Sequence, residues 1–178
     1  MPVETETGLK ASEFEAEIFI HMDSIYRFAL YMAGNENHAQ NLVKNAYLKV
    51  YKSFNGLREG TDHRSWLLTM LNDIFTNTIY RGREYSRRHK GSSDGANFDY
   101  RIGENPLDGV VASAIGKLPI SYRAAVLLAD MEGLSYSEIA AITGYPEETV
   151  ISRTCNGRSM LVKRLQNLLT QDTKESDG

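Results

Sequence analysis

Residues 134–153 read LSYSEIAAITGYPEETVISR, and this stretch decides the fold. Ser135 followed by Glu138 is the pairing of a capping box, so we expect a short helix to begin there. Gly144 should end that helix in a tight turn, and Pro146 suits the first position of the next helix, where its missing N–H leaves nothing unpaired. A short helix, a glycine turn and a second helix with polar and basic side chains predict a helix-turn-helix, which can place its second helix in the DNA major groove. An ordinary helical hairpin is the alternative.

Apolar residues recur at spacings of three and four along most of the remaining chain, which is typical of amphipathic helices. We expect a first helix from the capping box of Ser12 and Glu15 to a stop at Gly34, a second over residues 37–54, and a third from Thr61 or Asp62 into the basic stretch 81–88. No strand-like alternation lasts long enough to build a sheet, so the sequence predicts an all-α fold. The residues expected to face inward are Phe14, Ile18, Met22, Ile25 and Ala29, then Ala39, Leu42, Val43, Ala46, Tyr47 and Val50, then Trp66, Leu67, Met70, Leu71, Ile74 and Phe75.

Residues 89–108 break the helical pattern, because they combine glycine, serine and proline without a sustained period. The sequence therefore predicts two small helical domains, 12–88 and 109–169, joined by a flexible linker over 89–108. The helix-turn-helix lies in the second domain. The acidic start, 1–11, and the end, 170–178, are expected to be disordered tails.

The composition excludes several classes of protein. The chain has 178 residues, 42% of them apolar and 24% charged, which is typical of a globular protein and unlike a disordered or fibrous chain. No apolar run approaches the roughly 20 residues that span a bilayer, and the acidic start is unlike a signal peptide. We therefore expect no membrane insertion and a cytoplasmic location. The single cysteine, Cys155, excludes an internal disulfide.

The net charge of −3 conceals two basic segments. Residues 81–90 hold five basic side chains and one acid, and residues 150–164 hold four basic side chains and no acid. Two such segments suit two contacts with one polyanion, although two solvated helix faces are the alternative. Trp66, Tyr80 and Tyr85 lie near or within the first segment, and rings interleaved with bases suit single-stranded DNA. Trp66 fits a core position as well, and the two roles are compatible.

No catalytic or metal-binding constellation stands out in the sequence. The four histidines are scattered without metal-ligand spacing. Cys155 falls inside the second helix of the expected helix-turn-helix, where a small half-buried residue is a better interpretation than a nucleophile. The glycine-rich stretch at 91–103 lacks a phosphate-loop motif. We therefore expect no catalytic residue, no metal and no cofactor.

Three stretches carry a resemblance to a known family: FEAEIFIHMDSIYRFALYMAGN (14–35), AYLKVYKSFNGLREGTDHRSWLLTMLNDIFTNTIYR (46–81) and LPISYRAAVLLADMEGLSYSEIAAITGYPEETVISR (118–153). In this order they resemble the extracytoplasmic-function (ECF) group of bacterial sigma factors, within the sigma-70 family. The resemblance covers residues 13–88 and 107–168. It implies a protein that binds core RNA polymerase through the β′ and β subunits, directs transcription initiation at specific promoters, serves a stress response and is held by an anti-sigma factor.

The resemblance also implies a polymerase-binding face on the second helix. In the family, an acid-rich stretch there docks on the coiled coil of β′. The matching positions here are Gln40, Asn41, Leu42, Lys44 and Asn45. Neutral Gln40, Asn41 and Asn45 stand where the family has acids, and Lys44 stands where the family has glutamine. This departure leaves an alternative function open: a sigma-like DNA-binding regulator or partner-binding module with weakened polymerase binding.

Two DNA-reading surfaces follow from the same resemblance. We expect the two domains to close on each other and hide these surfaces when no polymerase is present. Gly157 stands where the family often has alanine and should cost the helix about 1 kcal/mol. The positions matched to the −10 element are Arg64, Trp66, Asn72, Asn77, Arg81 and Arg83, and those matched to the −35 element are Glu147, Glu148, Thr149, Ser152, Arg153 and Arg158.

Overall fold

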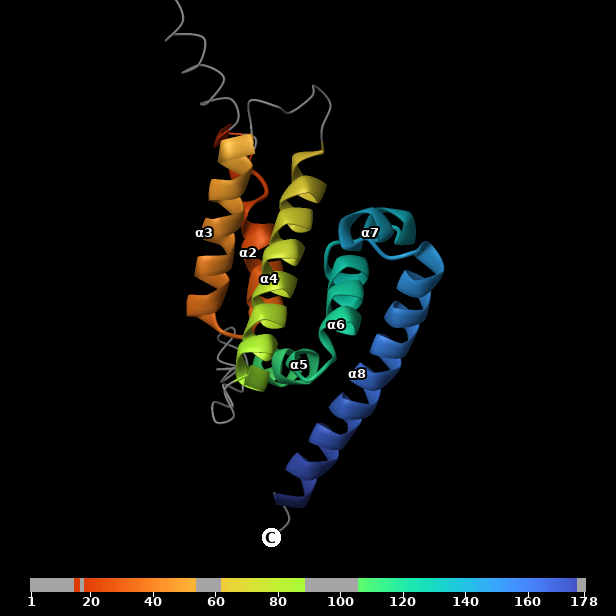
Figure 1. Ribbon diagram of the computed structural model, residues 1–178. Helices are drawn as coiled ribbons and strands as arrows, with labels where there is room; N and C mark the ends of the chain where they lie inside the picture. The colour runs from red at the N-terminus through yellow and green to blue at the C-terminus, as the bar shows by residue number, and fades with distance from the viewer. Residues whose placement is uncertain (1–14, 17, 54–61, 89–105, 176–178) are drawn as a thin grey trace, which may run out of the picture.

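The computed structural model describes residues 15–16, 18–53, 62–88 and 106–175 (Figure 1). No strand occurs in this part of the chain, so the predicted all-α fold is confirmed. The predicted tail 1–11 and residues 89–105 of the predicted linker lie outside the described residues. The elements are α2 (Met22–Ala33), α3 (Glu36–Ser53), α4 (His63–Arg88), α5 (Pro106–Gly116), α6 (Ile120–Val126), the π-helical turn η2 (Leu127–Met131), α7 (Tyr136–Thr143) and α8 (Glu147–Glu175).

Helices α2, α3 and α4 pack side by side into a first helical unit (Figure 1). Gly34 joins α2 to α3 as predicted, because its φ of 66° is left-handed and its N–H donates to the Leu30 carbonyl at 2.7 Å. Every residue predicted to face inward is buried or partly buried, apart from Phe14, which lies outside the described residues. The periodicity of three and four therefore located the core of this unit.

A turn interrupts the predicted first helix. Ser12 lies outside the described residues, residues 15–16 and 18–19 are helical, and a turn at Ile20 and His21 separates them from α2, which begins at Met22. The His21 N–H donates to the Ile18 carbonyl at 3.0 Å, which is the tighter i→i+3 pattern. This turn lets Ile18 reach the core while Phe19 and Ile20 remain exposed.

Asp62 caps the N-terminus of α4, as one of the two predicted caps. Its carboxylate accepts hydrogen bonds from the amides of Arg64 (3.1 Å) and Ser65 (3.3 Å) and from the Ser65 hydroxyl (2.5 Å). These bonds, the Ser65 hydroxyl first, hold the pKa of the Asp62 carboxyl below its usual value. Thr61 lies outside the described residues. The helix then continues to Arg88, as predicted from the basic stretch.

Helices α5 to α8 form the second helical unit (Figure 1). Helix α6 passes into η2, a wider turn that ends with the Glu132 N–H on the Leu127 carbonyl at 3.1 Å. Gly144, the predicted stop of α7, has a left-handed φ of 71°, and Gly133 after η2 has a left-handed φ of 67°.

Three helix boundaries differ from the predictions. Helix α8 begins at Glu147, so Pro146 precedes the first helical residue, and its carbonyl accepts the N–H groups of Thr149 (2.9 Å) and Val150 (3.1 Å). Helix α5 begins at Pro106, inside the predicted linker, because proline suits the first turn of a helix. Helix α8 runs to Glu175, beyond the predicted end at 169, since residues 170–175 contain no glycine or proline.

The two units pack against each other. Helix α2 contacts α5, α6 and η2, α4 contacts α7, and buried apolar residues of both units form one cluster. Arg123 of α6 is buried and donates to the carbonyls of Gly116, Leu118 (3.2 Å) and Met32 (2.5 Å). Its guanidinium therefore binds the C-terminal ends of α5 and α2, one from each unit. No helix in the described part of the chain is long and apolar enough to cross a membrane.

Candidate nucleic-acid interface

Helices α7 and α8 form the predicted helix-turn-helix (Figure 1). The Ser135 hydroxyl accepts the Glu138 N–H at 3.3 Å, and the Ser135 N–H donates to the Glu138 carboxylate at 2.7 Å, which completes the capping box. The Ser135 hydroxyl also donates to the Glu138 carboxylate at 2.6 Å, and this bond, followed by the one from the Ser135 N–H, lowers the pKa of the Glu138 carboxyl. On α8, Val150 and Thr154 are buried and hold the helix against the second unit. The opposite side of α8 is therefore free to face a ligand.

The positions matched to the −35 element lie on this outer side of α8. Glu147, Glu148, Ser152 and Arg158 are exposed, while Thr149 and Arg153 are partly buried. Cys155 is exposed, not half-buried as predicted, because it follows the buried Thr154 on the helix and points outward.

Both arginines matched to the −35 element have partners within the second unit. The guanidinium carbon of Arg153 lies 3.7 Å from the centroid of the Tyr145 ring, a cation–π contact. Its Nη1 is buried without a hydrogen-bond partner among the described residues. Arg158 donates to both carboxylate oxygens of Asp130, with Nη2 at 2.5 Å and Nε at 3.1 Å, and these bonds raise the pKa of its guanidinium.

On α4, Arg64 is engaged by the second unit. Its Nη2 lies 2.5 Å from the Glu132 carboxylate and also donates to the Glu132 carbonyl at 2.8 Å. The Ser24 hydroxyl of α2 donates to the same carboxylate oxygen. The Glu132 side chain is 1% exposed and that of Arg64 is 30% exposed, so the carboxylate end of this ion pair is shielded from water.

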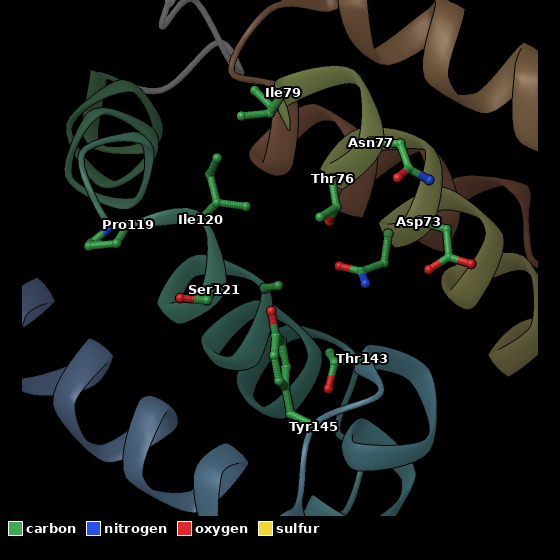
Figure 2. Close-up of a pocket in the computed structure, with 11 residues that line it drawn as sticks. Asp73, Thr76, Asn77, Ile79, Pro119, Ile120, Ser121, Thr143 and Tyr145 are labelled. Carbon is green, nitrogen blue, oxygen red and sulfur yellow. The ribbon is translucent and has the colours of Figure 1, made fainter. Parts of the chain in front are cut away.

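A cavity of about 260 Å³ separates the middle of α4 from the second unit (Figure 2). Asn72, which is 7% exposed, and Asn77, which is exposed, line it from α4. Thr143 and Tyr145 line it from the helix-turn-helix, and Figure 2 shows the Tyr145 ring reaching toward α4. The cavity therefore brings residues matched to the −10 element opposite the turn that precedes the matched −35 residues.

Among the described side chains, the other residues matched to the −10 element do not line this cavity. Trp66 is partly buried and packs against the core, in agreement with the core interpretation. Arg81 is exposed further along α4, and the side chain of Arg83 lies outside the described part of the chain.

The face matched to polymerase lies on α3. Gln40, Asn41, Lys44 and Asn45 are exposed, and Gln40 contacts Glu36 at 3.4 Å. Leu42 is only 7% exposed and belongs to the core, so it supports the face from beneath and does not lie on it. Apolar grooves run on both sides of the four exposed residues, one beside Phe19 and Tyr47 and one beside Phe75.

Comparisons with known proteins extend the geometric evidence. The model of the family "Sigma-70, region 4" matches residues 109–161. The ECF RNA polymerase sigma factor EcfG of Rhodopseudomonas palustris is 30% identical over 170 residues, which cover 91% of this chain and 88% of that protein. The chain belongs to the ECF RNA polymerase sigma factors.

Further relatives agree with this assignment. The ECF sigma factor SigE of Mycolicibacterium smegmatis is 32% identical over 150 residues, and the match spans 79% of this chain but 57% of that protein. Among solved structures, the sigma factor RpoE of Bartonella quintana, in complex with the anti-sigma factor NepR, has a TM-score of 0.72 at 25% identity and covers 86% of this chain and 97% of its own. CnrH, in complex with the cytosolic domain of CnrY, shares the fold with a TM-score of 0.63 at 21% identity, covering 89% of this chain and 88% of its own.

Three residues that join the two units of this sigma factor had no predicted role: Ser24, Arg123 and Glu132. Arg123 and Glu132 stand inside the quoted stretch 118–153, but nothing local marks their partners. The units do close on each other, as expected, although they cover the two matched DNA-reading surfaces to different extents. Arg64 and Asn72 are covered on the −10 side, whereas most of the −35 side stays exposed. No group of three or more His, Cys, Asp or Glu side chains in the described ranges is placed to hold a metal ion.

Proposed function

We propose that this sigma factor binds core RNA polymerase through the β′ and β subunits and directs it to specific promoters in a stress response. It acts in the cytoplasm, has no catalytic chemistry of its own and is controlled by an anti-sigma factor. The observation that carries the proposal is a helix-turn-helix with an outward polar face in a chain of this family. The structural relative RpoE, which is in complex with the anti-sigma factor NepR, supports the anti-sigma partner.

We propose a division of labour between the two units. The first unit is the region-2-like domain, whose α4 captures the unpaired −10 strand with Arg64, Trp66, Asn72, Asn77, Arg81 and Arg83. The second unit reads the −35 duplex with the side chains of α8 at Glu147, Glu148, Thr149, Ser152, Arg153 and Arg158. Exposed arginines on two separate helices support this assignment, because duplex readout and single-strand capture need different surfaces.

Run-off transcription with core polymerase tests the function, and two variants test the division of labour. Arg81→Ala combined with Arg83→Ala should reduce binding of holoenzyme to a forked promoter and lower its salt slope by about 0.7 for each lost strand phosphate. Arg153→Ala should weaken binding to a duplex −35 fragment and leave strand capture intact. Equal losses on both DNA substrates would show that the basic segments are general polyanion surfaces.

The exposed α3 face supports a second candidate, a sigma-like regulator that binds polymerase weakly. Its four exposed residues are neutral or basic, so none of these four offers a carboxylate to basic residues of a clamp. Asn41→Asp combined with Asn45→Glu should tighten binding to core polymerase if this face docks there. Gln166→Glu combined with Asn167→Asp adds the same charge at exposed positions of α8 and serves as the control. Transcription by the unmodified protein would reject this candidate.

A further inference from the structure

The contact between the two units at Glu132 has an unusual composition. One carboxylate oxygen, Oε2, accepts from Arg64 Nη2 at 2.5 Å and from the Ser24 hydroxyl. Both donors belong to the first unit, on α4 and α2, whereas Glu132 belongs to the second unit and follows η2. Two donors of one unit therefore converge on a single oxyanion of the other.

Burial makes this carboxylate depend on these donors. The Glu132 side chain is 1% exposed, and its Oε1 is buried without a hydrogen-bond partner among the described residues. A buried charge is costly unless it is paired, so the closed arrangement requires both donors to stay in place. When the units separate, Ser24 and Arg64 lose their oxyanion, and the first unit is left with an empty pair of donors.

We infer that Ser24 and Arg64 form a phosphate site for the unpaired promoter strand, and that Glu132 occupies this site in the closed form. A guanidinium and a hydroxyl are standard donors to DNA phosphate, and they bind a carboxylate through the same hydrogen bonds. The inference rests on the proposed strand capture by α4 and adds Ser24 as a contact and Glu132 as a competitor.

Other contacts between the two units also fit a competition between closure and binding of the promoter strand. Asn72 is covered by the second unit, and the cavity beside it is lined on the far side by Thr143 and Tyr145. A strand lying along α4 from Arg64 to Asn77 would have to displace these groups. Closure and strand binding are therefore alternative states of one surface, and the closed fraction lowers the apparent affinity for the strand.

The test measures the separation of the units and strand binding on the full chain. Cys155 is the single cysteine of the sequence and is exposed, so it takes one spin label. The second label is placed by Lys49→Cys, at an exposed position of α3. Glu132→Gln should lengthen the label-to-label distance and tighten binding of a short mixed-sequence single-stranded DNA about threefold or more. Glu36→Gln removes the same charge at an exposed position of α3 and should change neither distance nor affinity beyond a small general charge effect.

Two further variants separate the role of Ser24 and Arg64 in closing the units from their role in binding DNA. Arg64→Ala and Ser24→Ala should also lengthen the distance, but both should weaken strand binding, because they remove donors and not the competitor. An unchanged distance in all three variants would overturn the role of Glu132. A longer distance with unchanged strand affinity in Arg64→Ala and Ser24→Ala would overturn the phosphate site and, at Arg64, the proposed strand capture.

The source of the phosphate is tested with the unmodified, doubly labelled chain. Single-stranded DNA should lengthen the distance, while inorganic phosphate at the same phosphate concentration should leave it unchanged, because a strand binds several groups along α4 at once. Opening by inorganic phosphate alone would assign the site to a free anion and overturn the assignment to DNA. Circular dichroism of each variant checks that the helices remain folded.

Discussion

At the scale of single residues, Gly157 shows how packing reverses a local preference. It is buried in α8 where this helix packs on α6, and a Cβ there would lie 2.6 Å from Cγ2 of Val126 and 3.4 Å from the Tyr122 carbonyl oxygen. Val126 is itself buried, and a branched side chain in a helix has one strongly preferred rotamer, so it cannot move aside cheaply. The glycine therefore permits close approach of the two helices.

Gly157→Ala should lower the free energy of unfolding by about 1 to 2 kcal/mol, because overpacking at Val126 outweighs the gain in helix propensity. Helix propensity alone predicts the opposite sign. Urea unfolding followed by circular dichroism measures the change. Ser159→Ala, at an exposed position of the same helix, is the control and should be close to neutral. A more stable Gly157→Ala protein would show that α6 and α8 can move apart without cost.

Asp62 gives a prediction about pH, because hydrogen bonds from Ser65 and from the first amides of α4 lower the pKa of its carboxyl. A lowered pKa in the folded state adds stability above the unfolded pKa, and this stability is lost as the pH falls through the folded value. Asp62→Ala should therefore cost about 1 kcal/mol at neutral pH and progressively less below about pH 4. Asp62→Asn keeps an acceptor for the amides and should retain most of the neutral-pH stability. An Asp62→Ala deficit that stayed constant down to pH 2 would contradict the assignment.

At the scale of elements, the turn of the helix-turn-helix supports the recognition helix. Tyr145 lies in the turn between α7 and α8, and its ring stacks on the guanidinium of Arg153, about two turns into α8. The stacked face is desolvated, and the ring restricts the rotamers of the arginine side chain. The turn therefore positions the arginine that we assign to the −35 element.

Tyr145→Ala should weaken binding of holoenzyme to a duplex −35 fragment about two- to fivefold, because Arg153 loses its support. Tyr145→Phe keeps the ring and should bind like the unmodified protein. Fluorescence anisotropy across a salt series measures both, and the salt slope should not change, since no phosphate contact is removed. Equal losses in the two variants would assign the effect to the tyrosine hydroxyl and not to the ring.

The elements that the sequence predicted correctly are those set by neighbouring residues. The capping box at Ser135, the left-handed glycines and the buried stripes all depend on residues within four positions of each other, and they were predicted correctly. The pairing of Arg64 with Glu132 joins residues 68 positions apart, and no local pattern encodes it. The π-helical end of α6 was missed for a related reason, because it adjusts Leu127 to Met131 to tertiary packing.

At the scale of the whole molecule, the two units are joined by a continuous core as well as by the chain. Residues of α2 and α4 belong to the same buried cluster as those of α6 and α7. Among the described residues, buried apolar contact and the Arg123 bond to Met32 hold the units together. The two units therefore close on each other, as expected from the sequence, and share buried apolar residues.

Cleavage of the chain between the units should leave them associated. A site for a specific protease, inserted after Asp94, allows both peptide fragments to be produced from the folded protein. Because the core and the Arg123 bond cross between the units, the fragments should elute together in size-exclusion chromatography at micromolar concentration. Adding Glu132→Gln to the cleaved protein should favour separation on dilution, since it weakens the ion pair with Arg64, and Glu36→Gln should not. Separate elution of the unmodified fragments would show that the tether, and not the shared core, keeps the two units together.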